Sequence, residues 1–224
     1  MALTRAADVA EYFEFTNRET GDGRDAPLAS RVPDSLSALL ARPGRVELEE
    51  PLVWTWVNPD NPPGDVLTTI DSVRLVSPVV QQIFVEHLGP ADEIQWIAAE
   101  LELPDGTRLP QWVPHFPVLH DLLSDEGTDW AGNGVPMRYA YSRAKLTGHH
   151  VSVYSTRAVT LEVRGIGPIS IPAATASDTY VVSAAVVDAM READVTGALV
   201  MVARLMPECG LRSSPERGDF GTGA

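Results

Sequence analysis

Cysteine and long apolar runs are the two features that this 224-residue chain largely lacks. Its one cysteine, Cys209, excludes an intramolecular disulfide and a zinc site built from clustered cysteines. No apolar run approaches the roughly 18 residues that a membrane-spanning helix requires. The first residues also lack the basic and apolar regions of a secretory signal, so we predict a cytoplasmic protein that does not bind membranes.

Basic residues are scarce relative to acidic ones. The chain has 17 lysine and arginine residues against 31 aspartate and glutamate residues, which gives a net charge of −14. The excess lies in residues 1–130, which hold 8 arginines and 23 acidic residues, whereas residues 131–224 are close to neutral. Such a body repels nucleic-acid phosphates and attracts basic proteins. The charge therefore predicts a basic protein partner and no nucleic acid, with solubility alone as the other reading of an acidic surface.

Hydrophobic periodicity and turn residues predict an α+β fold. Two segments share one order of features: apolar residues, a serine, an amphipathic helix, a glycine and an apolar strand. Ser77 precedes the first helix and Ser183 the second, each in the N-cap position where a hydroxyl accepts a backbone N–H. We interpret both serines as caps and not as nucleophiles, since neither lies in a glycine-flanked elbow. The pattern predicts a mostly antiparallel sheet with short helices packed on one face and two strand–helix–strand repeats.

The first repeat has the clearest boundaries. Ser77-Pro78 predicts a helix from Pro78 to about His87, because proline is favoured at the first helical position. A strand over 94–103 and a second over 109–116 flank an Asp-Gly turn, which predicts a hairpin.

The chain divides into three predicted regions. Residues 1–71 form an acidic N-terminal segment packed on the same domain, residues 72–206 form the α+β domain, and residues 207–224 form an unstructured tail rich in glycine, serine and proline. Within the first region we expect a polar loop over 16–31 and a strand over 46–57, and we expect the two tryptophans of that strand to be core residues.

Histidines and carboxylates offer the sharpest catalytic alternative. His115 and His120 could form a metal-dependent hydrolase site together with Asp121. They are five residues apart with a proline between them, so they share neither a helix face nor a strand face, and a further ligand would have to come from a distant segment. We therefore predict no metal site here and, since phosphate-loop signatures are absent, no cofactor, and keep this hydrolase as an alternative.

The repeat carries a family resemblance. The pattern Leu75-Val76-Ser77 with its helix, the strand and Pro-Asp-Gly turn that follow, and the closing Val181-Val182-Ser183 with its helix and Thr196-Gly197 resemble a bacterial polymorphic-toxin immunity family. That family was first described as a domain of unknown function and is typified by a myxobacterial immunity domain. The resemblance covers roughly residues 72–205. It implies a protein that performs no catalysis and that binds and neutralises a cognate toxin made by the same cell.

The charge and the resemblance lead to one functional expectation. An acidic inhibitor is steered toward the basic substrate groove of a nucleic-acid-cutting toxin, so we predict an immunity protein whose acidic half contacts that toxin. A scaffold protein of a toxin-secretion locus is a further alternative, and the sequence leaves the oligomeric state open. The residues expected to contact the partner are Glu47, Glu49, Glu50, Asp92 and Glu93.

Overall fold

The computed structural model describes most of the chain between residues 12 and 206. The described residues are 12–17, 26–33, 36–40, 44–71, 73–89, 93–118, 122–124, 127–130, 136–146, 159–163, 167–171 and 180–206. The predicted tail over 207–224 therefore lies outside the described residues. The fold is α+β with mostly antiparallel sheets, as the sequence predicted.

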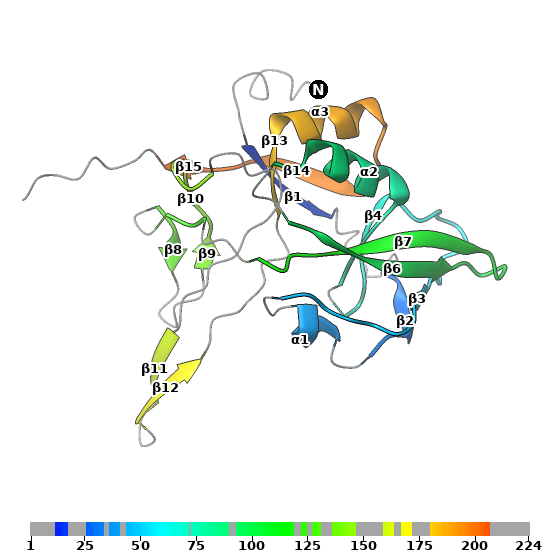
Figure 1. The fold of residues 1–224 in the computed structure, drawn as a ribbon, viewed down its shortest axis with the longest axis horizontal. Coiled ribbons are helices and arrows are strands. Elements are labelled where there is room, and N and C mark those ends of the chain that lie inside the picture. The colour runs from blue at the N-terminus through cyan, green and yellow to red at the C-terminus, as the bar shows by residue number, and fades with distance from the viewer. Residues whose placement is uncertain are drawn as a thin grey trace, which may run out of the picture.

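The larger sheet has six strands in the order β2-β3-β6-β7-β5-β4 (Figure 1). Its strands are β2 (Leu28–Arg31), β3 (Leu52–Thr55), β4 (Val66–Thr68), β5 (Arg74–Val76), β6 (Gln95–Glu102) and β7 (Arg108–His115). β3 and β6 are parallel, and the other neighbours are antiparallel. The predicted hairpin is confirmed as β6 and β7, and its turn contains Gly106 at φ +82°.

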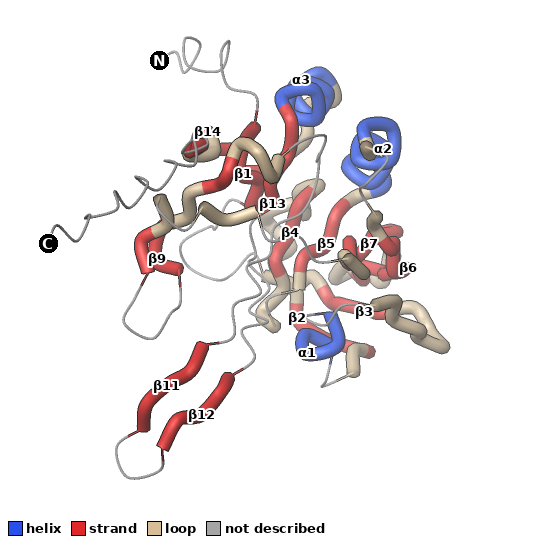
Figure 2. The backbone as a smooth tube through the Cα atoms, turned by 60° about the vertical axis from the view of Figure 1, so that its left-hand side comes forward, coloured by secondary structure: helices blue, strands red, loops and turns tan. Residues whose placement is uncertain are grey.

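The smaller sheet has three antiparallel strands, β13-β1-β14. They are β13 (Tyr180–Ser183), β1 (Tyr12–Asn17) and β14 (Ala198–Val202). Two helices, α2 (Pro78–His87) and α3 (Ala184–Glu192), lie side by side (Figure 2), and a third, α1 (Leu36–Leu40), lies beside β2 and β3. The short remaining strands are β8 (Asp129–Trp130), β9 (Pro136–Arg138), β10 (Tyr141–Ser142), β11 (Val159–Val163), β12 (Gly167–Ile171) and β15 (Leu205–Met206).

The two predicted strand–helix–strand repeats are β5-α2-β6 and β13-α3-β14. In each repeat a third, antiparallel strand lies between the two strands that flank the helix: β7 lies between β5 and β6, and β1 lies between β13 and β14. Each repeat is thus a split β-α-β unit. Ser77 and Ser183 occupy the two N-cap positions, and the Ser77 hydroxyl accepts the N–H of Val80 at 3.4 Å. The Ser183 side chain makes no such capping bond. The predicted N-cap positions are therefore correct for both helices, but the predicted capping hydrogen bond forms only at α2.

The two sheets meet where β4 begins. The carbonyl oxygen of Thr196 accepts the backbone N–H groups of Asp65 and Val66 at 3.1 and 3.2 Å. In return, the Asp65 carboxylate accepts the N–H and the hydroxyl of Thr196, both at 2.8 Å. Gly197 follows at φ +76°, and a Cβ added there would lie 2.4 Å from the carbonyl oxygen of Val66. The backbones approach closely at this junction because residue 197 is glycine.

Two main clusters of buried residues stabilise the sheets. One joins α2 and α3 to β1, β13 and one face of β4 and β5, and in it the buried Arg74 guanidinium lies 4.3 Å from the ring centroid of Tyr180. The other lies beneath the six-stranded sheet with Leu36 of α1. Trp54 and Trp56 belong to this second cluster and are 0% and 3% exposed, which confirms their predicted place in the core.

Two sequence predictions are wrong in their boundaries, and one strand was not predicted. The strand expected over 46–57 is only Leu52–Thr55, because the residues before it leave the sheet. The loop expected over 16–31 ends in strand β2, which pairs with β3. Strand β4, whose three residues follow a proline-rich turn, was not predicted from the sequence. Among the described residues, no helix is long and apolar enough to span a membrane.

Candidate partner-binding groove

Residues 44–51 form the segment that carries three of the five predicted contact residues. Two side chains of the six-stranded sheet and the backbone just after β7 hold its start in place. The Gly44 N–H donates to the carbonyl of Pro117 at 2.8 Å, and the buried His115 Nε2 donates to the carbonyl of Gly44 at 2.7 Å. The Gln95 side-chain amide donates to the carbonyl of Val46 at 2.6 Å and accepts its N–H at 2.8 Å. The segment is therefore fixed to β6 and β7 although it has no regular secondary structure of its own.

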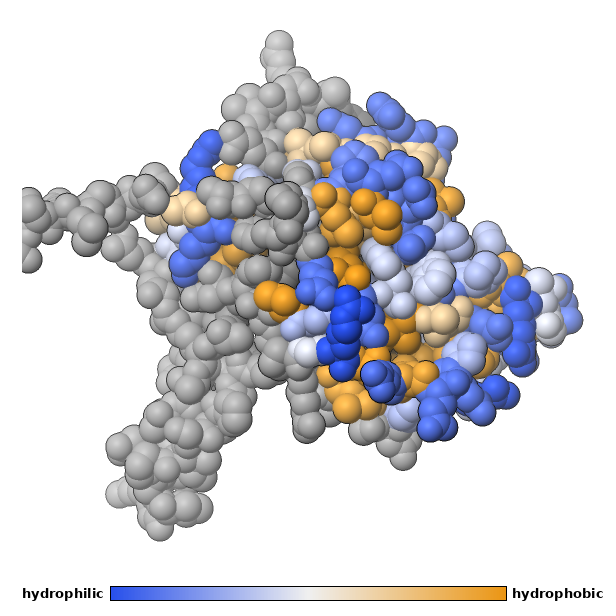
Figure 3. All heavy atoms as spheres, viewed as in Figure 1, coloured by the Kyte–Doolittle hydropathy of each residue, from blue (hydrophilic) through white to orange (hydrophobic). Residues whose placement is uncertain are grey.

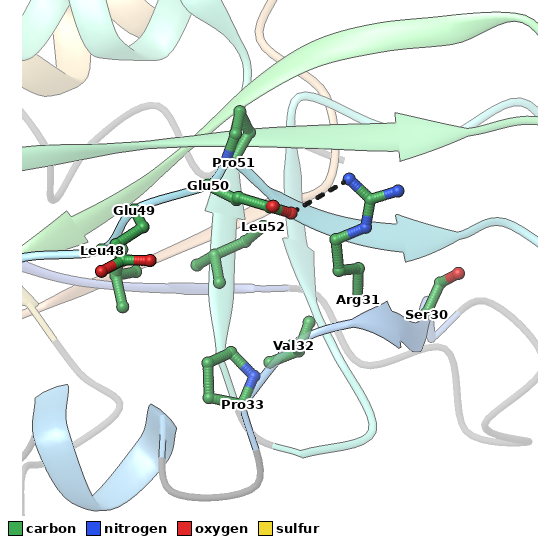
Figure 4. Close-up of a pocket in the computed structure, with 9 residues that line it drawn as sticks. All are labelled: Ser30, Arg31, Val32, Pro33, Leu48, Glu49, Glu50, Pro51 and Leu52. Atoms are coloured by element: carbon green, nitrogen blue, oxygen red, sulfur yellow. Dashed lines mark hydrogen bonds and ion pairs between the residues drawn. The ribbon is translucent and has the colours of Figure 1, made fainter.

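A groove of about 440 Å³ opens where this segment and β2 diverge. Figure 4 shows that one wall comes from the end of β2 and the residues after it, and the other from the approach to β3. The half-buried side chains of Val32 and Leu48 and the buried Leu52 supply apolar surface inside it. The residues that line the groove are Ser30, Arg31, Val32, Pro33, Leu48, Glu49, Glu50, Pro51 and Leu52.

Acidic side chains stand at this groove. Glu50 extends toward Arg31 and pairs with it at 3.4 Å, whereas Glu49 extends in the other direction beside Leu48 (Figure 4). Both partners of the Arg31–Glu50 pair are well exposed, with side chains 61% and 70% accessible. Exposed pairs of this kind contribute little to stability. The structure thus places Glu49 and Glu50 together at one groove.

The other predicted contact residues have different surroundings. Glu47 is exposed on the same segment, and within the described part of the chain neither it nor Glu49 forms an ion pair. Glu93 pairs with Arg45 at 2.7 Å, which links it to the start of the segment. Asp92 lies outside the described residues. Sequence reasoning treated the five acids as equivalent, and it missed the two arginines that pair with Glu50 and Glu93.

Apolar and polar surfaces are interleaved on this molecule, as Figure 3 shows for the face seen in Figure 1. A second exposed apolar surface lies on β14, where Leu199, Met201 and Val202 are 40%, 46% and 53% exposed. In the described part of the sheet β14 is an edge strand. It carries no charged side chain.

The structure gives His115 a structural hydrogen bond. Its Nε2 carries the proton that Gly44 accepts, so this nitrogen has no lone pair for a metal ion. Among the described residues, no group of three or more histidine, cysteine, aspartate or glutamate side chains is placed to hold a metal ion. His120 and Asp121, the other members of the alternative hydrolase site, lie outside the described residues.

One other pair of neighbouring polar side chains has shifted pKa values. Glu14 of β1 lies beside Tyr141 of β10; burial raises the pKa of Glu14, and the Tyr141 hydroxyl opposes that rise. Burial and the neighbouring Glu14 carboxylate raise the pKa of Tyr141 far above its ordinary value. A tyrosine with a raised pKa stays protonated at neutral pH, so Tyr141 supplies no phenolate nucleophile.

Comparison with known proteins adds no relative: no family model matches the chain, and no curated protein matches it.

Proposed function

We propose that the protein is an immunity-type inhibitor that binds a basic toxin through its acidic groove and catalyses no reaction. One observation carries this proposal: exposed carboxylates stand on a segment that the sheet holds in place, beside a groove with apolar surface inside it. Preorganised charge beside apolar surface is what a protein-binding site requires, because it loses little conformational freedom on binding.

The net charge of −14 supports a basic partner. Complementary fields of this size raise the rate of encounter, and local contacts then set how long the complex lasts. Within the groove region Glu47 and Glu49 are the first candidates for contact, since Glu50 and Glu93 already pair with Arg31 and Arg45.

The test begins with the gene directly upstream of this one, which we expect to encode a toxin with a C-terminal effector domain. We expect the chain to bind that domain and to abolish its toxicity when the two are co-expressed. Absence of a complex with it would contradict the proposal.

Charge reversal then locates the contact. We expect the double variant Glu47→Lys, Glu49→Lys to associate with the toxin domain at least about tenfold more slowly at about 0.02 M salt. At about 0.3 M salt its association rate should fall much less. Glu86→Lys, Glu192→Lys makes the same change in net charge at exposed positions of α2 and α3, and it should slow association far less. Equal effects of the two double variants, or no effect at either salt, would contradict the groove as the contact site.

A further inference from the structure

The groove beside Glu49 has the chemistry of a receptor for one arginine side chain. It combines an acidic end with an apolar interior, which matches the charged head and the apolar stem of arginine. We propose that the groove takes an arginine presented on the surface of the basic partner, with its stem against Val32 and Leu48 and its guanidinium at Glu49. This inference rests on the proposed function and names the group that the same site recognises.

The chain itself supplies an example of the recognised group. Arg31 lines the groove and pairs with the Glu50 carboxylate at 3.4 Å. An arginine already lies against one carboxylate of the groove, whereas Glu49, whose side chain lies beside Leu48 in Figure 4, forms no ion pair with the described residues. Among the described residues, Glu49 is thus the groove carboxylate to which we assign the second guanidinium.

Arginine fits this groove better than lysine for two reasons. Its planar guanidinium can donate two parallel hydrogen bonds to one carboxylate, which an ammonium cannot do. It is also more weakly hydrated, so it loses less on leaving water for a groove with apolar walls. The groove should therefore distinguish the two cations although both carry one positive charge.

Arg31 should weaken the binding of the partner's arginine. While it pairs with Glu50 it contributes a positive charge at the groove and repels an incoming guanidinium. Removing this charge should strengthen binding, which is the opposite of what a merely structural role for Arg31 predicts.

The experiment uses N-acetyl-arginine amide as the probe and follows backbone amide resonances of the full chain by NMR. We expect saturable shifts for residues 30–32 and 48–52, millimolar affinity, and weaker binding of N-acetyl-lysine amide. The isosteric neutral control, N-acetyl-citrulline amide, should not bind. Glu49→Gln should weaken arginine binding at least about fivefold and Arg31→Gln should strengthen it, whereas Glu192→Gln should change neither affinity nor site.

Three results would overturn the inference: no saturation with arginine, equal binding of citrulline, or shifts spread over the whole acidic surface. These results are independent of the toxin experiment. If the toxin domain binds but arginine does not, the inference fails while the proposed function stands. If arginine binds but the toxin domain does not, the proposed function fails.

Discussion

The two split β-α-β units follow one plan but obtain their middle strands differently. In β5-α2-β6 the middle strand β7 follows β6 through a tight hairpin, whereas in β13-α3-β14 the middle strand β1 comes from the other end of the described chain. A hairpin closes a short loop, and the pairing of β1 closes a very long one, at a greater cost in chain entropy. The first unit is therefore the more self-sufficient of the two.

The contact between the units compensates for this difference. β14 follows directly on Thr196 and Gly197, and both residues meet the start of β4. The second unit is thus attached to the larger sheet by backbone contacts as well as by the core that α2 and α3 share. Changes at this junction should have larger effects than equivalent changes within the first unit.

The largest effect is expected for Gly197→Ala. The alanine would have to adopt the left-handed backbone of Gly197, and its Cβ would lie 2.4 Å from the carbonyl oxygen of Val66. We therefore expect a loss of about 3 kcal/mol or more in the free energy of unfolding. Gly106→Ala is the matched control, since it has a similar φ of +82° with open space around it and should cost about 1 kcal/mol. Urea denaturation measures both, and equal losses would show that the close approach to β4 is unimportant.

A smaller difference is expected between the two N-cap serines. Ser77→Ala removes the hydroxyl that accepts the N–H of Val80 and should cost about 1 kcal/mol. Ser183→Ala removes no capping bond and should cost clearly less. Thermal unfolding of the two variants under identical conditions compares them, and the reverse order would contradict the structural difference between the caps.

The smallest effect is a change in the pH dependence of stability. Burial acts to raise the pKa of Asp65, but hydrogen bonds from the backbone and hydroxyl of Thr196 and from Ser77 outweigh it, so the pKa lies below the ordinary 3.8. The ionised carboxylate therefore stabilises the fold above pH 3.8, and this contribution is lost as the pH falls through the lower pKa of the folded state. Unfolding measured from neutral to acidic pH should show a shallower acid loss for Asp65→Asn than for the unaltered chain. Parallel curves would contradict this.

Local signals predicted the first unit well. Ser77-Pro78 defines the start of α2, and the Asp105-Gly106 turn defines the β6–β7 hairpin, because both depend on neighbouring residues. The pairing of β1 between β13 and β14 could not be predicted in this way. It depends on contacts between segments far apart in the sequence, for which a single sequence gives no register.

The candidate site was predicted in part. Acidic composition pointed to Glu49 and Glu50, and the structure places both at one groove. Their different surroundings could not be predicted, because Arg31 reaches Glu50 only where β2 and the approach to β3 diverge. Recognising β2 as a strand would have required a signal in Leu28–Arg31, whose four residues are all exposed and show no alternation between apolar and polar.

Amide hydrogen exchange of the chain with and without the upstream-encoded effector domain tests the central claim most directly. If the acidic groove contacts the partner, added protection should fall on residues 28–32 and 44–50, while α3 and β14 exchange as they do in the free protein. Protection confined to the apolar edge strand β14, with the groove unchanged, would contradict the account and place the partner on the opposite unit.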